Sequence, residues 1–328
     1  MDGFEGKRTG KVTGKIAGQM QEKQAASNLG GSFHYFMKAW FDGRPFTGSQ
    51  VQPDQATVDG TLVESLHALG YLPAGSHVPY FKVAGRTDKG VSARAALYYI
   101  QVQRKFHPCE VNSWMRSQDH PISIWSVARL DGFVNPRKAR SRTYLYFLPG
   151  WTCPVPVSVL ERGMVALGGE YDFATFAKSP VIPGVETNRT LETSVETRRL
   201  GSGNRVMHVL HFSSTGFLRE QIRRMVGFLL EGEDEGDNDG IQDIGKRVER
   251  AFASGPHLPV DPAPAENLVL WDVVPEENVR WENVDGCQAF TKDWMADQHE
   301  AVAIHEAQLS MMVDELPRAG EASRGKHK

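Results

Sequence analysis

β-prone segments and an amphipathic segment alternate along the first part of the chain. Residues 34–41 (HYFMKAWF) are rich in aromatic side chains and predict a strand, which the following Asp-Gly pair would end with a turn. Apolar residues then recur at spacings of three and four between Val58 and Leu69, which predicts a helix ending at Gly70. Two further β-prone segments flank a polar, glycine-bracketed loop at 84–93. Strand, helix and strand in this order indicate an α+β fold.

Predicted strands and helices continue along the chain to about residue 274. We predict the following elements from their periodicity: a helix within 108–118, strands at 122–128 and 144–148, a helix at 159–167, strands at 191–197 and 206–212, helices at 218–230 and 244–253, and a strand at 268–274. An acidic run at 231–239 interrupts the second half and predicts a solvated loop over 231–243. Prolines and glycines gather near Gly150, where we place a boundary between two halves.

Four segments follow from this reading. Residues 1–32 lack an apolar period and predict a flexible N-terminal arm, and residues 282–328 predict an appended, helix-prone tail whose role the sequence does not give. Between them we expect an N-terminal half at 33–150 and a C-terminal half at 151–281. The expected fold class is therefore α+β, with two α/β halves.

Composition narrows the class of protein. No run of apolar residues approaches the length of a membrane span, and the N-terminus lacks an apolar signal core. The three cysteines are far apart in the sequence, so we expect neither a disulfide framework nor a cysteine-based zinc site. A reducing, cytoplasmic compartment is the corresponding expectation.

Charge is strongly segregated although the net charge is only −3. Acidic residues concentrate at 231–239. Basic residues form one cluster in the middle of the chain and another later: Arg137, Lys138, Arg140 and Arg142, then Arg219, Arg223 and Arg224. A local basic face, rather than the total charge, is what a nucleic-acid partner requires, so the sequence permits one.

Three side chains could combine into a reactive site. Asp88 lies in the glycine-bracketed loop, where flanking strands would hold its carboxylate still. Tyr144 begins an aromatic strand directly after a basic loop, and Arg223 lies on a predicted helix one turn beyond Arg219. A planar guanidinium is suited to orient a carboxylate, and an aromatic ring to stack on a base. Taken singly, Asp88 is equally consistent with a solvated turn, whereas an arginine in the middle of a helix is more often solvated and a tyrosine on a strand more often belongs to the core.

The order and the amino-acid sequences of several segments resemble those of the TruA-type tRNA pseudouridine synthase family. The segments that carry the resemblance are Gly85-Arg86-Thr87-Asp88-Lys89-Gly90-Val91, Phe41-Asp42-Gly43, Arg142-Thr143-Tyr144-Leu145-Tyr146, Gly216-Phe217-Leu218 with Ile222-Arg223-Arg224-Met225-Val226-Gly227, and Pro264-Ala265-Glu266-Asn267-Leu268. They extend in order from about residue 33 to residue 274. Ser92 stands where bacterial members carry a histidine and resembles the archaeal form, whereas Ser49 replaces a usual aromatic residue and Asn135-Pro136 a histidine-containing pair.

The resemblance implies a pseudouridine synthase fold with mostly antiparallel sheets around a central RNA-binding cleft. It implies an isomerase that converts uridine to pseudouridine in the anticodon stem-loop of tRNA, as a homodimer, without a metal or another cofactor. Asp88 would be the nucleophile, or the base that starts deglycosylation, with Arg223 as its cationic partner and Tyr144 as the residue that stacks on the flipped base. The expected RNA contacts are Arg86, Arg137, Lys138, Arg140, Arg142 and Arg219.

Three other interpretations stay open. A non-catalytic RNA-binding protein of the same fold would use Asp88 only to cap a turn. A synthase of the same kind could act on other RNAs, because the residues do not say which uridines are chosen. Asp88 could also be a metal ligand in a nuclease or phosphotransferase, but such sites usually gather several carboxylates, and only the acidic run at 231–239 offers them.

Overall fold

The computed structural model describes residues 32–73, 80–178, 184–200, 205–231, 243–283 and 286–297. The strands are β1 (Phe33–Phe41), β2 (Phe81–Val83), β3 (Ser92–Val102), β4 (Ile122–Leu130), β5 (Ala139–Pro149), β6 (Gly169–Asp172), β7 (Asn188–Arg199), β8 (Val206–Ser214), β9 (Leu268–Pro275) and β10 (Glu282–Asn283). The helices are α2 (Val58–Ala68), α3 (Pro108–Ser117), α4 (Val157–Leu167), α5 (Gln221–Leu230) and α6 (Ile244–Ala253), with short 3-10 turns η1 (Phe173–Phe176) and η2 (Ala265–Asn267) and a further helix over residues 286–297.

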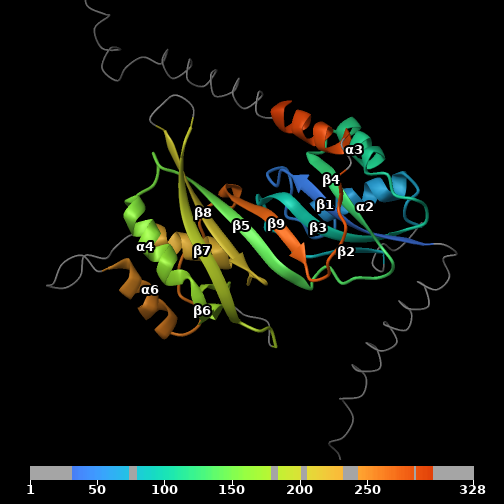
Figure 1. The fold of residues 1–328 in the computed structure, drawn as a ribbon. Coiled ribbons are helices and arrows are strands. Elements are labelled where there is room, and N and C mark those ends of the chain that lie inside the picture. Colours follow the sequence, from blue (N-terminus) through green and yellow to red (C-terminus); the bar gives the residue numbers. More distant parts are fainter. Residues whose placement is uncertain are drawn as a thin grey trace, which may run out of the picture.

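The strands form one open sheet in the order β10-β4-β1-β3-β9-β5-β8-β7-β6, with β2 paired to β3. Most neighbours are antiparallel, and β3 with β9 is the parallel pair among the described strands. Figure 1 shows α2 and α3 beside one end of this sheet and α4 and α6 beside the other end. The expected α+β class with a mostly antiparallel sheet is confirmed.

Strand β9 joins the two ends of the sheet. It comes late in the chain, yet it lies between β3 and β5, where Ala93 pairs with Leu270 and Tyr144 pairs with the same leucine from the other side. The strand that follows the Asp88 loop and the strand that carries Tyr144 are thereby fixed at a constant spacing. The predicted boundary near Gly150 stays a prediction.

Helix α2 forms where the apolar spacing predicted it. Thr57 is its N-cap, and the threonine hydroxyl accepts a hydrogen bond from the Gly60 amide at 3.2 Å. Val58, Leu62 and Leu66 are buried on one face of the helix. In its first turn the Val58 amide donates to the Gly48 carbonyl at 3.3 Å and the Asp59 amide to the Ser49 carbonyl at 2.9 Å, so the helix begins against the segment that contacts the Asp88 loop.

Helix α5 begins later than the sequence indicated. It starts at Gln221, after Glu220 in a left-handed conformation with φ of 59°. Arg219 consequently precedes the helix, so Arg219 and Arg223 do not share one helical face as we had predicted. The left-handed residue turns the chain sharply before the helix, a feature that hydrophobic periodicity does not report.

The first part of the C-terminal tail belongs to the folded unit. The helix over residues 286–297 lies next to α3 (Figure 1). The ring of Trp294 packs 6.2 Å from that of Trp40, and the hydroxyls of Thr291 and Ser123 are 2.6 Å apart. The predicted N-terminal arm, most of the acidic loop and the rest of the tail lie outside the described residues. No helix within the described ranges has the length and hydropathy needed to cross a bilayer.

Candidate active site

The Asp88 loop lies between β2 and β3 and is fixed by a neighbouring segment. The Thr87 amide donates to the hydroxyl of Ser49 at 2.8 Å, and the Ser49 amide donates to the Thr87 carbonyl at 3.1 Å. Gly90 has φ of 84°, which favours glycine. A Cβ on Gly43 would come within 2.1 Å of the Val91 carbonyl oxygen, so this glycine permits the close approach of the two segments. Backbone contacts therefore hold the carboxylate in position.

Arg223 on α5 and Asp88 in the loop between β2 and β3 face each other. The Nη1 atom of the Arg223 guanidinium lies 3.8 Å from Asp88 Oδ2, within the range of an ion pair. The same guanidinium donates through Nε to the Ala263 carbonyl at 2.7 Å, and the Ala263 amide donates to the Arg223 carbonyl at 2.9 Å. The Asp88 side chain is 36% exposed and the Arg223 side chain 16%. The Ala263 carbonyl therefore fixes the guanidinium of this pair, while the more exposed Asp88 carboxylate is accessible to a substrate.

The electrostatic environment of Asp88 is mixed. Burial raises the pKa of its carboxyl, and the nearby Glu220 carboxylate raises that pKa further. Arg223, Arg219 and Lys178 act in the opposite direction and favour the ionised form. The net effect raises the pKa of Asp88 above its ordinary value, and Arg223 is the cation that opposes this rise most strongly.

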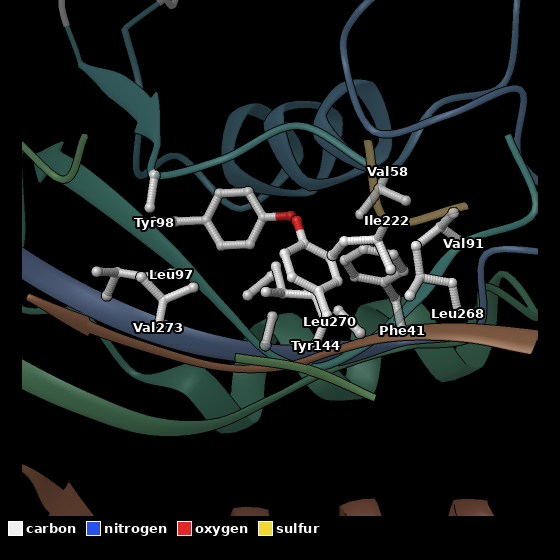
Figure 2. Close-up of a cluster of buried hydrophobic side chains, with 14 of the residues drawn as sticks. Phe41, Val58, Val91, Leu97, Tyr98, Tyr144, Ile222, Leu268, Leu270 and Val273 are labelled. Carbon is white, nitrogen blue, oxygen red and sulfur yellow. The ribbon is translucent and has the colours of Figure 1, made fainter. Parts of the chain in front are cut away.

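Tyr144 lies beside the same loop, in an apolar cluster. Figure 2 shows Tyr144 in a cluster of buried side chains with Tyr98, Phe41 and Ile222, which come from β3, β1 and α5. Its ring meets Phe217 edge to face, with centroids 5.2 Å apart. Burial raises the pKa of the Tyr144 hydroxyl to about 12. The phenol consequently stays protonated at neutral pH.

Arg142 lies inside the protein rather than on an RNA-binding surface, which corrects our expectation for this residue. Its guanidinium donates to the carbonyls of Ala84 at 2.7 Å and Arg137 at 2.9 Å, and also to the carbonyl of Thr215. The side chain is buried, and burial lowers its pKa. Arg142 therefore ties the strand before the Asp88 loop to β5 and to the turn after β8.

The other predicted RNA contacts are exposed. Arg86 lies two residues before Asp88, Arg219 lies close enough to Asp88 to lower its pKa, and Arg137 and Lys138 lie just before β5. Arg140 is exposed too, but its guanidinium donates to the Glu276 carbonyl at 3.0 Å. These positions fit an RNA-binding role, which stays a prediction.

Three residues of the site were not predicted from the sequence. Ser49 appeared only as a departure from the family pattern, yet its hydroxyl fixes the Asp88 loop. Lys178 and Glu220 form an ion pair of 2.7 Å close to Asp88. A lone acid within the basic run at 219–224 was the only available signal for Glu220, and Lys178 had none. Within the described ranges, no group of three His, Cys, Asp or Glu side chains could hold a metal ion.

Comparison with known proteins gives a consistent result. The family model described as tRNA pseudouridine synthase matches residues 164–274. A protein of Methanocorpusculum labreanum named tRNA pseudouridine synthase A is 33% identical over 240 residues, which cover 72% of this chain and 78% of that protein. Proteins of the same name from Thermoplasma volcanium and Pyrococcus furiosus are 29% and 28% identical; the latter match covers 85% of this chain and 96% of the relative.

The family model and the relatives therefore identify the class of protein as an isomerase of the pseudouridine synthase fold that acts on tRNA. The chain belongs to the tRNA pseudouridine synthase family.

Proposed function

We propose that this protein isomerises uridine to pseudouridine in the anticodon stem-loop of tRNA, with Asp88 as the nucleophile. The observation that carries the proposal is the ion pair between Asp88 and Arg223, brought together from a loop and a distant helix. Membership of the family supports the reaction and tRNA as the substrate. The anticodon stem-loop is proposed from the sequence resemblance.

The reaction rearranges bonds within one nucleotide. The bond between N1 of uracil and C1′ of the ribose breaks, the uracil turns within the site, and C5 bonds to C1′. A proton leaves C5 and N1 gains one, so no oxidant or reductant is required. Asp88 must be ionised to attack, and the cations around it favour that state against the effect of burial.

Tyr144 and Arg223 have separate roles in this proposal. The Arg223 guanidinium, fixed by the Ala263 carbonyl, keeps the Asp88 carboxylate oriented. The Tyr144 ring stacks on the flipped base, and its hydroxyl takes part in the proton transfer at C5. Since the pKa of that hydroxyl is about 12, it takes part as a neutral phenol that donates or relays a proton.

Base flipping and RNA binding are assigned to exposed cations. Unstacking the target uridine costs a few kcal/mol, and Arg86, two residues before Asp88, would fill the vacated position or hold the phosphate. Arg137, Lys138, Arg140 and Arg219 would contact the RNA backbone, which predicts salt-sensitive binding.

Two further parts of the proposal rest on the resemblance. We propose a homodimer that binds tRNA across both subunits, and light scattering with and without tRNA measures this. A cytoplasmic location is consistent with the free thiols of Cys109, Cys153 and Cys287.

Release of tritium from tRNA labelled at C5 of uridine tests the reaction. We expect release with the intact chain, stoichiometric with pseudouridine, and unchanged in EDTA. An RNA-binding protein without catalysis would release none, and inhibition by EDTA that added Mg²⁺ reverses would favour a metal-dependent site. Mapping the product in total cellular RNA separates the anticodon stem-loop from other RNA substrates.

A further inference from the structure

A second charged cluster adjoins the Asp88–Arg223 pair. Glu220 lies at its centre: one carboxylate oxygen accepts from Lys178 Nζ at 2.7 Å and the other faces the Arg224 guanidinium at 3.3 Å. The Glu220 side chain is only 10% exposed, and its backbone adopts the left-handed conformation with φ of 59°. This strained conformation places the carboxylate on the side of α5 that faces Lys178.

The backbone fixes the same contact. The Lys178 amide donates to the Arg219 carbonyl at 2.9 Å, which joins the segment after η1 to the turn before α5. The ammonium group and the Glu220 carboxylate are therefore held together by a backbone hydrogen bond and by an ion pair. Both residues lie close enough to Asp88 to alter its pKa, in opposite directions.

The positively charged side chains of this region differ in how many hydrogen bonds and ion pairs they already form within the protein. Arg223 faces Asp88 and donates to the Ala263 carbonyl. Arg224 donates to the Val260 carbonyl at 2.9 Å and faces Glu220. Lys178, by contrast, has Glu220 as its side-chain partner among the described residues, and its side chain is 40% exposed. An ammonium group has three N–H donors, so at least one of them stays available for a ligand.

We propose that Lys178 binds a phosphate oxygen next to the target uridine, and that Glu220 is a positioning residue that holds the Lys178 ammonium beside Asp88. The inference rests on the proposed function, because the phosphate belongs to the RNA substrate. An ammonium group is a compact charge that suits a single phosphate oxygen. Glu220 also gives this ammonium a partner other than Asp88, so the nucleophile is not neutralised by a second direct ion pair.

Glu220 has a second consequence for Asp88. Hydrogen bonds from Lys178 and Arg224 oppose its burial and lower its pKa, so Glu220 stays ionised. As a like charge it raises the pKa of Asp88, against Arg223, Arg219 and Lys178. Removing the Glu220 charge should therefore move the ionisation of Asp88 to lower pH. A merely structural ion pair would not be expected to move it in that direction.

The test compares Lys178→Gln and Glu220→Gln in the full chain, with Lys246→Gln as control. Lys246 is an exposed lysine of α6, so its variant removes the same charge from another part of the surface. Binding of a tRNA transcript is measured over a range of salt concentrations, and single-turnover product formation over a range of pH.

For Lys178→Gln we expect the slope of log affinity against log salt to become shallower by about 0.7 to 0.9, the loss of one phosphate contact. Affinity at low salt should fall about tenfold, and Lys178→Arg should restore most of it. For Glu220→Gln we expect the acidic limb of the rate profile to move to lower pH. Urea midpoints report whether each variant is folded.

The possible failures are distinguishable. If the wild-type chain forms no pseudouridine, the proposed function is wrong. If the wild type is active but Lys178→Gln has the same salt slope as Lys246→Gln, the phosphate contact is overturned. If the acidic limb of Glu220→Gln stays in place or moves to higher pH, the role of Glu220 beside Asp88 is overturned.

Discussion

Replacing Arg142 by lysine tests whether the buried guanidinium stabilises the fold through its hydrogen bonds to backbone carbonyls. The guanidinium donates to the carbonyls of Ala84, Arg137 and Thr215. Lysine keeps the positive charge, but one compact ammonium cannot reach three carbonyls in different directions. We therefore expect Arg142→Lys to leave two of these three carbonyls without this donor.

The expected size of the effect follows from those two bonds. A hydrogen bond that involves a charged group contributes about 1.5 to 3 kcal/mol, so the loss of two costs about 3 kcal/mol or more. A domain of ordinary stability, about 5 to 15 kcal/mol, would still fold at low temperature. The Ala84 carbonyl lies four residues before Asp88, and under the proposed mechanism a displacement of the Asp88 carboxylate by about 1 Å would lower turnover roughly 100-fold.

Urea unfolding measures the change in stability, and tRNA binding at several salt concentrations measures any change in RNA contacts. We expect a lower urea midpoint with an unchanged salt slope for Arg142→Lys. The control is Arg140→Lys, two residues earlier on β5, where the side chain is exposed and the change should stay within about 0.5 kcal/mol. Because lysine keeps the charge, the urea midpoint is the readout that decides: wild-type stability of Arg142→Lys would contradict the buried role of Arg142 and show our reasoning to be wrong.

Three further changes test the site and its surroundings. Arg223→Lys keeps the charge but cannot hold both the Ala263 carbonyl and Asp88, so single-turnover rates should fall about 100-fold while the urea midpoint stays near wild type; a normal rate would contradict the orienting role. Ser49→Ala removes the acceptor of the buried Thr87 amide, which should cost about 1 to 3 kcal/mol in urea and slow turnover. Burial raises the pKa of Asp59 from 3.8 to about 7, so its ionisation opposes folding by up to about 4 kcal/mol once the pH exceeds 8, and this loss vanishes below pH 4. Asp59→Asn should therefore stabilise the protein at pH 8 and not at pH 4, by urea unfolding at both values; equal effects at the two pH values would contradict this.

Local patterns predicted most of the fold. The three- and four-residue spacing that includes Val58 and Leu62 gave α2, because one buried helical face leaves that period in the sequence. The glycines around Asp88 predicted a tight loop between strands, and the loop is there. Such features depend on neighbours in the chain, so they can be read from the sequence.

The features that could not be predicted depend on distant contacts. The order of strands places β9 between β3 and β5, which no local pattern reports. Arg142 looked like one of several basic residues, and only the carbonyls that converge on it from three segments make it a buried residue. Lys178 and Glu220 meet because a left-handed residue turns the chain before α5. The distant contacts around Asp88 were therefore harder to predict than the loop that carries it.

The single most direct test of the account is the activity of Asp88→Asn on tRNA labelled with tritium at C5 of uridine. Asparagine keeps the size of the side chain and removes its negative charge. We predict no tritium release and no pseudouridine, with tRNA affinity within a few-fold of wild type and an unchanged urea midpoint. Pseudouridine formation at a wild-type rate by this variant would contradict the assignment of Asp88 as the nucleophile.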